Sequence, residues 1–217
     1  MNQLLTREQY WDRAAEKKEF TTPFQVELFR DVVAKEACIL DIGCGYGRTL
    51  SQLDLCGFHN STGVDIAEGM IKRGKKLFPG LSLEHIEDCG KIPFADNSFD
   101  TVILLAVLTC IIDDLEQEQL IREINRVLKK DGIIYMNDFL INSDQRNVDR
   151  YTEFEPKYNK YGIFELQEEK RVALRHYTKA RIDELIVKFE KIVFEPVVYK
   201  TMNGNQSNGF YYMGRKM

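Results

Sequence analysis

A short apolar run that leads into three closely spaced glycines constrains the fold of this chain most. Residues 38–42 (Cys-Ile-Leu-Asp-Ile) have the length and apolar character of a buried strand. Gly43, Gly45 and Gly47 follow directly, and a helical pattern then begins at residue 48. Glycines between a strand and a helix permit a tight turn and let a ligand approach the backbone closely. This segment therefore predicts an α/β fold with a ligand site at the turn.

Strand and helix patterns continue to alternate along the chain, which is typical of a parallel sheet with helices on both faces. The expected strands are residues 38–42, 61–66, 81–86, 100–105 and 133–139. The expected helices between them are residues 48–55, 67–77 and 113–130, the last ending before Gly132. After a helix at residues 181–189, two strand-like segments at 192–199 and 209–215 are joined by a short polar loop. They should pair as an antiparallel hairpin.

Two further segments complete what we expect to be one domain over residues 1–217. Residues 1–37 carry helical patterns interrupted near Pro23, and we interpret them as an N-terminal helical cap. Residues 142–177 lack a clean period and are rich in Tyr and Phe, so we interpret them as an insertion after the fifth strand. A long aromatic segment at the ligand edge of the sheet is typical of a lid over a partly apolar substrate. A satellite core is the alternative.

Composition excludes several classes of partner. The chain has 30 Lys and Arg against 34 Asp and Glu, a net charge of -4, whereas a nucleic-acid binder shows a positive excess. The longest apolar stretch, residues 102–108, is far shorter than a membrane span, and the N-terminus lacks the apolar core of a signal peptide. The five cysteines have irregular spacing without zinc-ligand motifs. We therefore predict a cytoplasmic protein with no nucleic-acid or membrane partner.

Acidic residues follow or close the first three expected strands. Asp41 precedes the first glycine by two residues, Asp65 closes the second strand and Asp88 follows the third. Because the carboxyl ends of parallel strands meet in one crevice, we expect these side chains to converge, and an acid at the place of Asp65 can accept both ribose hydroxyls. Arg48 stands where a dinucleotide fingerprint has its last glycine. The set suits a ligand with adenine, ribose and a positively charged tail, but no phosphate.

Five segments, in this order, resemble class I S-adenosylmethionine-dependent methyltransferases. They are residues 41–47 (DIGCGYG), 63–66 (GVDI), 88–89 (DC), 92–100 (IPFADNSFD) and 128–132 (LKKDG). The resemblance covers about residues 38–139 and implies a doubly wound, mostly parallel seven-stranded sheet of the Rossmann-like kind. It also implies an antiparallel C-terminal hairpin, S-adenosyl-L-methionine as the cofactor and a transferase activity.

The resemblance further implies a cofactor site at the glycine turn and at the ends of the next strands. Its members are Asp41, Gly43, Cys44, Gly45, Gly47, Asp65, Ile66, Asp88, Cys89, Leu105 and Ala106. In this scheme the glycine turn with Asp41 holds the methionine end, Asp65 binds the ribose hydroxyls, and Asp88 with the Cys89 amide reads the adenine. Ile66 lies against the adenine, and Leu105 and Ala106 line the sulfonium side. Trp11 either folds over the cofactor or simply anchors the first helix.

Two residues are candidates for direct roles toward the methyl acceptor. His176 ends the aromatic insertion, and because histidine titrates near neutrality it is a candidate general base; a surface histidine is the alternative. Asp138 stands at the end of the fifth strand, where it would point toward the crevice and contact the substrate. Residues 104–105 carry no acid that would complete a metal-ligand set with Asp138, so we predict no metal.

These observations lead to one functional hypothesis with two alternatives. We expect a methyltransferase that acts on a small-molecule acceptor by in-line displacement. A non-catalytic S-adenosylmethionine-binding module is disfavoured because all three acids are present. A macromolecule methyltransferase acting on RNA or protein is the second alternative; residues 103–106 (ILLA) lack the polar, proline-containing motif of nucleic-acid amino-methyltransferases.

Overall fold

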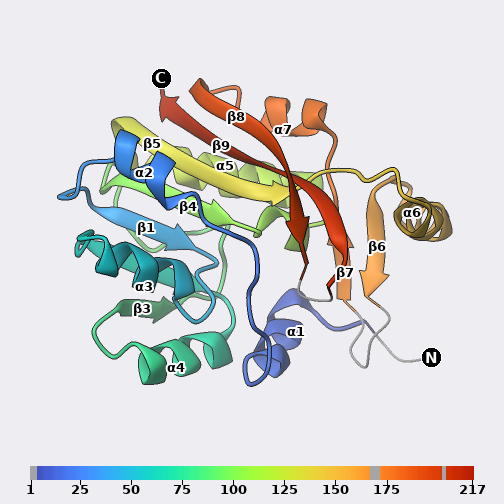
Figure 1. Cartoon of the computed structure of the whole chain (residues 1–217), viewed down its shortest axis with the longest axis horizontal. Helices are drawn as coiled ribbons and strands as arrows, with labels where there is room; N and C mark the ends of the chain where they lie inside the picture. Colours follow the sequence, from blue (N-terminus) through green and yellow to red (C-terminus); the bar gives the residue numbers. More distant parts are fainter. Residues whose placement is uncertain (1–3, 167–171, 202–203) are drawn as a thin grey trace.

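The structure of the chain is a computed structural model that describes residues 4–166, 172–201 and 204–217 (Figure 1). The strands within these residues are β1 (Ile39–Ile42), β2 (Ser61–Asp65), β3 (Ser82–His85), β4 (Phe99–Leu105), β5 (Leu128–Phe139), β6 (Ile163–Leu166), β7 (Val172–Arg175), β8 (Phe189–Lys200) and β9 (Gln206–Lys216). The helices are α1 (Arg7–Ala14), α2 (Val26–Val32), α3 (Arg48–Leu55), α4 (Glu68–Leu77), the short 3-10 helix η1 (Leu108–Cys110), α5 (Asp114–Val127), α6 (Gln145–Tyr158) and α7 (Lys179–Leu185).

The described strands form one large sheet in the order β3-β2-β1-β4-β5-β9-β8, seven strands in all. The first five are parallel, and β9 runs antiparallel to both β5 and β8. This confirms the predicted fold, including the antiparallel C-terminal hairpin. The strand order reverses between β1 and β4, and ligands of open α/β sheets bind at the carboxyl ends of the strands at such a switch point.

Helices cover both faces of the sheet, which explains why its central strands β1 and β4 are mostly apolar. In β5, Ile134 and Met136 belong to a buried cluster that includes residues of α5 and α7. Their neighbours Ile133 and Tyr135 point to the other face and belong to a cluster with residues of α2 and α3. The alternation follows from the two-residue period of a strand, and it leaves the carboxyl edge of the sheet as the open side.

The end of α5 differs from the sequence-based prediction. The expected helix continued to Lys130 with Gly132 as its cap, but α5 ends at Val127 and β5 begins at Leu128. Leu128 is fully buried and pairs with Phe99 of β4, so tertiary pairing and burial outweigh its helical propensity. The left-handed conformation falls on Asp131 (φ 60°).

The insertion is more regular than its sequence pattern indicates. It contains α6 and a two-stranded antiparallel sheet in which β6 pairs with β7. In Figure 1 these elements lie at one end of the molecule, beside the carboxyl end of β5. The aromatic rings of Tyr151 and Phe164 pack between α6 and β6, with ring centroids 6.0 Å apart. Packing among these rings, which no short-range period reveals, stabilises the segment.

The N-terminal segment folds back over the sheet edge. A capping box of Thr6 and Gln9 begins α1, and the helix is fastened to α4 because Asp12 Oδ1 accepts a hydrogen bond of 2.7 Å from the Gly69 amide. Farther along, the Pro23 carbonyl accepts a 2.8 Å hydrogen bond from Asn137 Nδ2 of β5. These contacts hold residues between α1 and α2 beside the carboxyl ends of the central strands.

Three sequence-based exclusions concern features that the coordinates also describe. All five cysteines are free thiols. None of the helices in the described ranges combines the length and apolar character that crossing a membrane requires. Across those ranges, no three His, Cys, Asp or Glu side chains gather closely enough to hold a metal ion. The cytoplasmic setting and the lack of a metal stay predictions.

Candidate active site

The glycine turn after β1 is shaped by backbone hydrogen bonds to β2. The amides of Gly43 and Cys44 both donate to the Val64 carbonyl oxygen, at 2.8 and 3.1 Å. Gly43 and Gly45 have φ angles of 69° and 56°, in the left-handed region that residues other than glycine rarely adopt. The chain can therefore make this turn only with residues that lack a Cβ.

Steric contacts add to this requirement. A Cβ on Gly43 would lie 2.5 Å from Cγ2 of Val107, and one on Gly45 would lie 2.3 Å from Cε2 of Phe20. Val107 and Phe20 line the same pocket as the two glycines. The missing side chains thus let the pocket extend down to the backbone of the turn.

Two buried carboxylates border the turn. Asp65 accepts hydrogen bonds of 2.8 Å from the amides of Gly45 and Ala67, yet burial still raises its pKa. Burial, reinforced by the charge of Asp65 and opposed by Arg48, raises the pKa of Asp41 to about 8. Carboxylates held in this way favour a ligand that brings positive charge or hydroxyl donors.

Most of the predicted site residues line one pocket. They are Trp11, Asp41, Gly43, Cys44, Gly45, Asp65, Ile66, Cys89, Leu105, Ala106 and His176. Burial raises the pKa of the Cys44 and Cys89 thiols, so both are small neutral residues beside the pocket. Residues predicted from the ends of β1, β2 and β4 thus lie together in one pocket, and their cofactor roles stay predictions.

Three predicted residues lie outside the pocket lining. Gly47 is the N-cap of α3, and a Cβ there would crowd Leu81 and Leu83 at 3.2 Å. Asp88 is exposed, and its Oδ1 accepts the Gly90 amide at 2.7 Å in a local turn, while its neighbour Cys89 borders the pocket.

Asp138 is the third residue outside the lining, although it stands at the carboxyl end of β5 as expected. Its carboxylate accepts the Thr109 amide at 3.2 Å and the Phe139 amide at 2.8 Å. Burial raises its pKa to about 7 despite these bonds. The Asp138 side chain therefore holds η1 in place through its hydrogen bond to Thr109. Because it does not line the pocket, it is not placed to contact a substrate there.

His176 lies in the pocket wall, but its geometry is that of a hydrogen-bond donor. Its Nδ1 is 2.6 Å from the Tyr151 hydroxyl and 3.2 Å from Asn142 Nδ2. The amide of Asn142 is oriented by the backbone, because its oxygen accepts the Asn208 amide and its nitrogen donates to the Leu140 carbonyl. Nδ1 is thus surrounded by donors and accepts, which leaves the proton on Nε2.

The surroundings of His176 also keep the ring neutral. Burial, with smaller contributions from Arg150 and Arg146, lowers its pKa well below the ordinary value. A neutral ring with its proton on Nε2 has no free acceptor nitrogen for the pocket. The geometry therefore disfavours the general-base role that the sequence suggested and favours a role as donor.

Comparisons with known proteins agree with this site. A family described as "Methyltransferase domain" matches residues 40–136. The chain is 32% identical over 111 residues to a sterol 4-C-methyltransferase of Caenorhabditis elegans, which covers 48% of this chain and 32% of that protein. It is 31% identical over 163 residues to an arsenite methyltransferase of Aquipseudomonas alcaligenes, covering 67% of this chain and 45% of that protein. The chain thus spans about a third to a half of these curated relatives.

A solved structure extends the similarity over nearly the whole chain. An S-adenosylmethionine-dependent methyltransferase of Methanosarcina mazei superposes with a TM-score of 0.81 at 26% identity, covering 90% of this chain and 99% of that one. The chain therefore belongs to the class I S-adenosylmethionine-dependent methyltransferase family. Within the family the cofactor is S-adenosylmethionine, and the open glycine turn with its two buried carboxylates fits that group.

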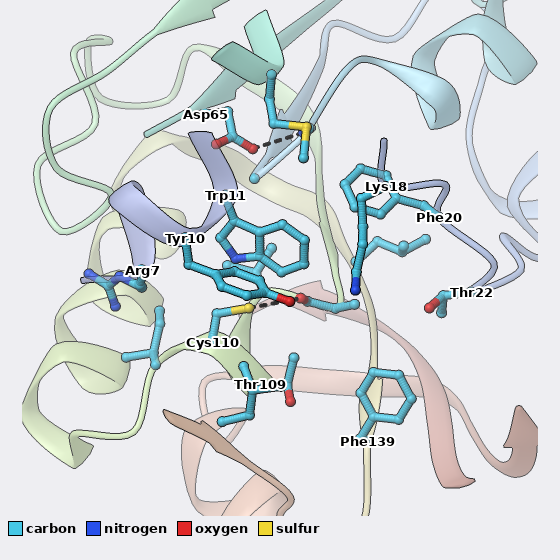
Figure 2. Close-up of a pocket in the computed structure, with 18 of the residues that line it drawn as sticks. Arg7, Tyr10, Trp11, Lys18, Phe20, Thr22, Asp65, Thr109, Cys110 and Phe139 are labelled. Atoms are coloured by element: carbon cyan, nitrogen blue, oxygen red, sulfur yellow. Dashed lines mark hydrogen bonds between the residues drawn. The ribbon is translucent and has the colours of Figure 1, made fainter. Parts of the chain in front are cut away.

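Aromatic side chains of the N-terminal segment form one wall of the pocket. We call this wall, made of Tyr10, Trp11 and Phe20, the aromatic roof. The rings of Trp11 and Tyr10 are 5.0 Å apart, and Phe20 connects Trp11 to Tyr46 with centroid distances of 5.8 and 5.0 Å. In Figure 2 the Trp11 ring lies between Asp65 and Cys110. Of the two interpretations of Trp11, the structure thus places its ring in the pocket wall.

Sequence reasoning missed the residues that line the methyltransferase pocket far from the glycine turn. They include Arg7, Lys18, Thr109, Cys110, Phe139, Arg146, Arg150 and Phe164. They come from α1 and the segment after it, η1, the end of β5 and the insertion, which carry no motif. Only the aromatic content of the insertion was a signal, and it did not identify the individual residues.

Proposed function

We propose that the chain transfers a methyl group from S-adenosylmethionine to a small-molecule acceptor. One observation carries the proposal: a single pocket joins the glycine turn, with Gly43 and Asp65, to an apolar wall of the insertion that includes Phe164. Cofactor and acceptor would thus share one space, as direct transfer between them requires. The relatives named for sterol and arsenite methylation support an acceptor of small size.

Within this pocket each wall has a proposed task. The amides of the glycine turn and the carboxylate of Asp41 hold the methionine end, and Asp65 accepts the ribose hydroxyls. Ile66 and Cys89, beside Ile86, form the apolar adenine wall. Trp11 covers the cofactor, and Leu105 with Ala106 borders the sulfonium.

The chemistry requires alignment more than acid–base catalysis. The bound cofactor supplies a methyl group on a positively charged sulfur. The protein contributes by holding the acceptor's nucleophilic atom in line with the methyl carbon at about 3–3.5 Å and by excluding water. Tyr10, Trp11 and Phe139 contribute apolar surface for this purpose. Cys110, whose pKa burial raises to about 12, stays a neutral thiol in the wall.

A thermal-shift comparison tests the cofactor part of the proposal. S-adenosylhomocysteine at 100 times its Kd should add about 2.7 kcal/mol to the free energy of unfolding, which is roughly 5–10 °C in Tm. The same concentration of NAD should leave Tm unchanged. Asp65→Asn, which keeps an oxygen acceptor for the Gly45 amide but loses the charge, should remove most of the shift. A shift with NAD and none with S-adenosylhomocysteine would contradict the proposal.

Methyl transfer into fractionated cell material tests the acceptor class. The purified chain is incubated with methyl-labelled S-adenosylmethionine and, separately, with small molecules, RNA and protein. We expect label in the small-molecule fraction alone. Label in RNA or protein favours a macromolecule methyltransferase, and cofactor binding without any transfer favours a non-catalytic binding module.

A further inference from the structure

The two ends of the pocket differ in the ionisable groups that the described residues supply. Among the described residues that line it, the carboxylates are Asp41 and Asp65, both beside the glycine turn. The wall formed by the insertion contains Arg146 and Arg150 of α6 together with the ring of His176. Arg48 lines the pocket beside Asp41 as well, so the cofactor end carries groups of both signs. The described part of the opposite end presents cationic groups and hydrogen-bond donors without a carboxylate.

Arg150 is a half-buried cation, and within the described residues the carboxylate whose charge acts on it is that of Asp144. Its guanidinium carbon lies 3.5 Å from the centroid of the Phe164 ring. Its Nε is buried without a hydrogen-bond partner, and no carboxylate in the described part of the chain forms an ion pair with it. Burial lowers the pKa of Arg150, and Arg146 adds to that effect. Burial of an unpaired charge is costly, so a bound anion would stabilise this arrangement.

Arg146 lies one helical turn before Arg150 and adds a second positive charge to the same pocket wall. Like charges four residues apart on a helix repel each other, and both arginines nevertheless lie at the pocket wall. The nearest carboxylate oxygen paired with Arg146 is Asp144 Oδ1, at 3.8 Å from its Nε. Both arginines act on His176, where their charges help to lower the pKa of the ring. The three groups line the same pocket and can therefore act on one ligand.

His176 supplies a neutral donor beside these cations. Tyr151 and Asn142 occupy its Nδ1, so its remaining proton is on Nε2. A donor in this place suits an acceptor oxygen of a ligand and does not suit a cation. Phe139 stacks on the His176 ring at a centroid distance of 5.5 Å and adds an apolar surface next to the polar one.

We propose that the methyl acceptor is a small carboxylic acid with an apolar body. Its carboxylate binds to Arg150 and Arg146, with the Nε2–H of His176 as a further donor, and its body lies against Phe139 and Phe164. A planar guanidinium matches a carboxylate through two parallel hydrogen bonds, which favours this anion. The inference rests on the proposed function. The methyl group goes to another atom of the acceptor, so the product keeps its negative charge.

The test uses the small-molecule fraction of a cell extract and methyl-labelled S-adenosylmethionine. One portion of the extract is first passed over an anion-exchange resin that removes carboxylic acids. The full-length chain should label a product in the untreated portion, this product should bind the resin at neutral pH, and the depleted portion should give no product. Retention at pH 2, where carboxylic acids are neutral and phosphate esters keep a charge, distinguishes a carboxylate from a phosphate.

Variants of Arg150 test whether the insertion binds the methyl acceptor. Arg150→Gln should lower kcat/KM for the labelled acceptor by about 10- to 100-fold, mainly through KM, since bonds to charged groups have that size. Arg150→Lys, which keeps the charge but loses the fork, should give an intermediate value. Affinity for S-adenosylhomocysteine should stay unchanged in both, which also shows that they fold. Arg122→Gln, on the exposed side of α5, is the matched control and should match the parent chain.

Three outcomes would overturn the inference. Equal turnover of the depleted extract, an unretained product, or unchanged KM in Arg150→Gln each contradicts an anionic acceptor while leaving the methyltransferase proposal intact. If S-adenosylhomocysteine binds but the untreated extract gives no product, the proposed function itself fails, and the inference fails with it.

Discussion

Gly45→Ala is expected to lower the affinity for S-adenosylhomocysteine by about 10- to 100-fold, the equivalent of 1–3 kcal/mol of overpacking. Gly45 has a φ of 56°, and an added Cβ would lie 2.3 Å from the Phe20 ring, so this ring must leave its place in the roof. Phe20 is stacked on Tyr46 and in edge contact with Trp11, which means that its displacement disturbs the whole aromatic roof. Titration calorimetry with S-adenosylhomocysteine measures the effect.

The control for this variant is Gly57→Ala. Gly57 also has a positive φ, of 91°, but its nearest neighbour is the side chain of Lys35 at 3.6 Å. Gly57→Ala should therefore lose a similar roughly 1–2 kcal/mol of stability from backbone strain and bind S-adenosylhomocysteine normally. Equal affinities in the two variants would show that the Gly45 position does not border the cofactor.

Asp41→Asn is expected to stabilise the ligand-free protein and to weaken cofactor binding at the same time. The pKa of Asp41 is about 8 in the folded chain, against about 3.9 in an unfolded one. The unfolded carboxyl therefore ionises as pH rises above about 4 while the folded one stays protonated, and this lowers stability progressively up to pH 8. Asparagine does not ionise, so Asp41→Asn removes this loss of stability. The gain in the free energy of unfolding is at most roughly 4 kcal/mol at pH 7.

Urea denaturation at pH 5 and pH 8 measures the first half of this prediction. The difference in unfolding free energy between Asp41→Asn and the parent chain should be larger at pH 8. S-adenosylhomocysteine titrations measure the second half, where the loss of a charge-assisted bond should cost about 1.5–3 kcal/mol. Asp31→Asn, an exposed carboxylate on α2, should change neither quantity. A variant that loses stability evenly at both pH values would contradict the buried, protonated state of Asp41.

The core of the fold was predictable because its signals are local. The apolar runs of β1 and β4 and the helical pattern of α5 are patterns within a few residues of one another. The errors arose where long-range pairing decides the conformation. Leu128 is a good helix former, but pairing with Phe99 makes it the first residue of β5.

The site residues also divide into those that local sequence patterns located and those that they did not. The glycine turn and the acids after β1 and β2 could be located because the carboxyl ends of parallel strands must meet. Asp88 and Asp138 show the limit of that argument. Each stands at the expected place in sequence, but its carboxylate already accepts a hydrogen bond from a nearby backbone amide, and neither lines the pocket.

The sequence by itself determined the sheet, its winding and the proposed cofactor end of the pocket, because strand period, glycine placement and acid spacing are properties of neighbouring residues. Only the tertiary structure decided the acceptor end. Arg146 and Arg150 come from α6 and His176 follows β7, and packing alone brings them together. The proton position of His176 likewise depends on Tyr151, 25 residues away in sequence. Contacts of this kind arise from three-dimensional burial, which no local pattern encodes.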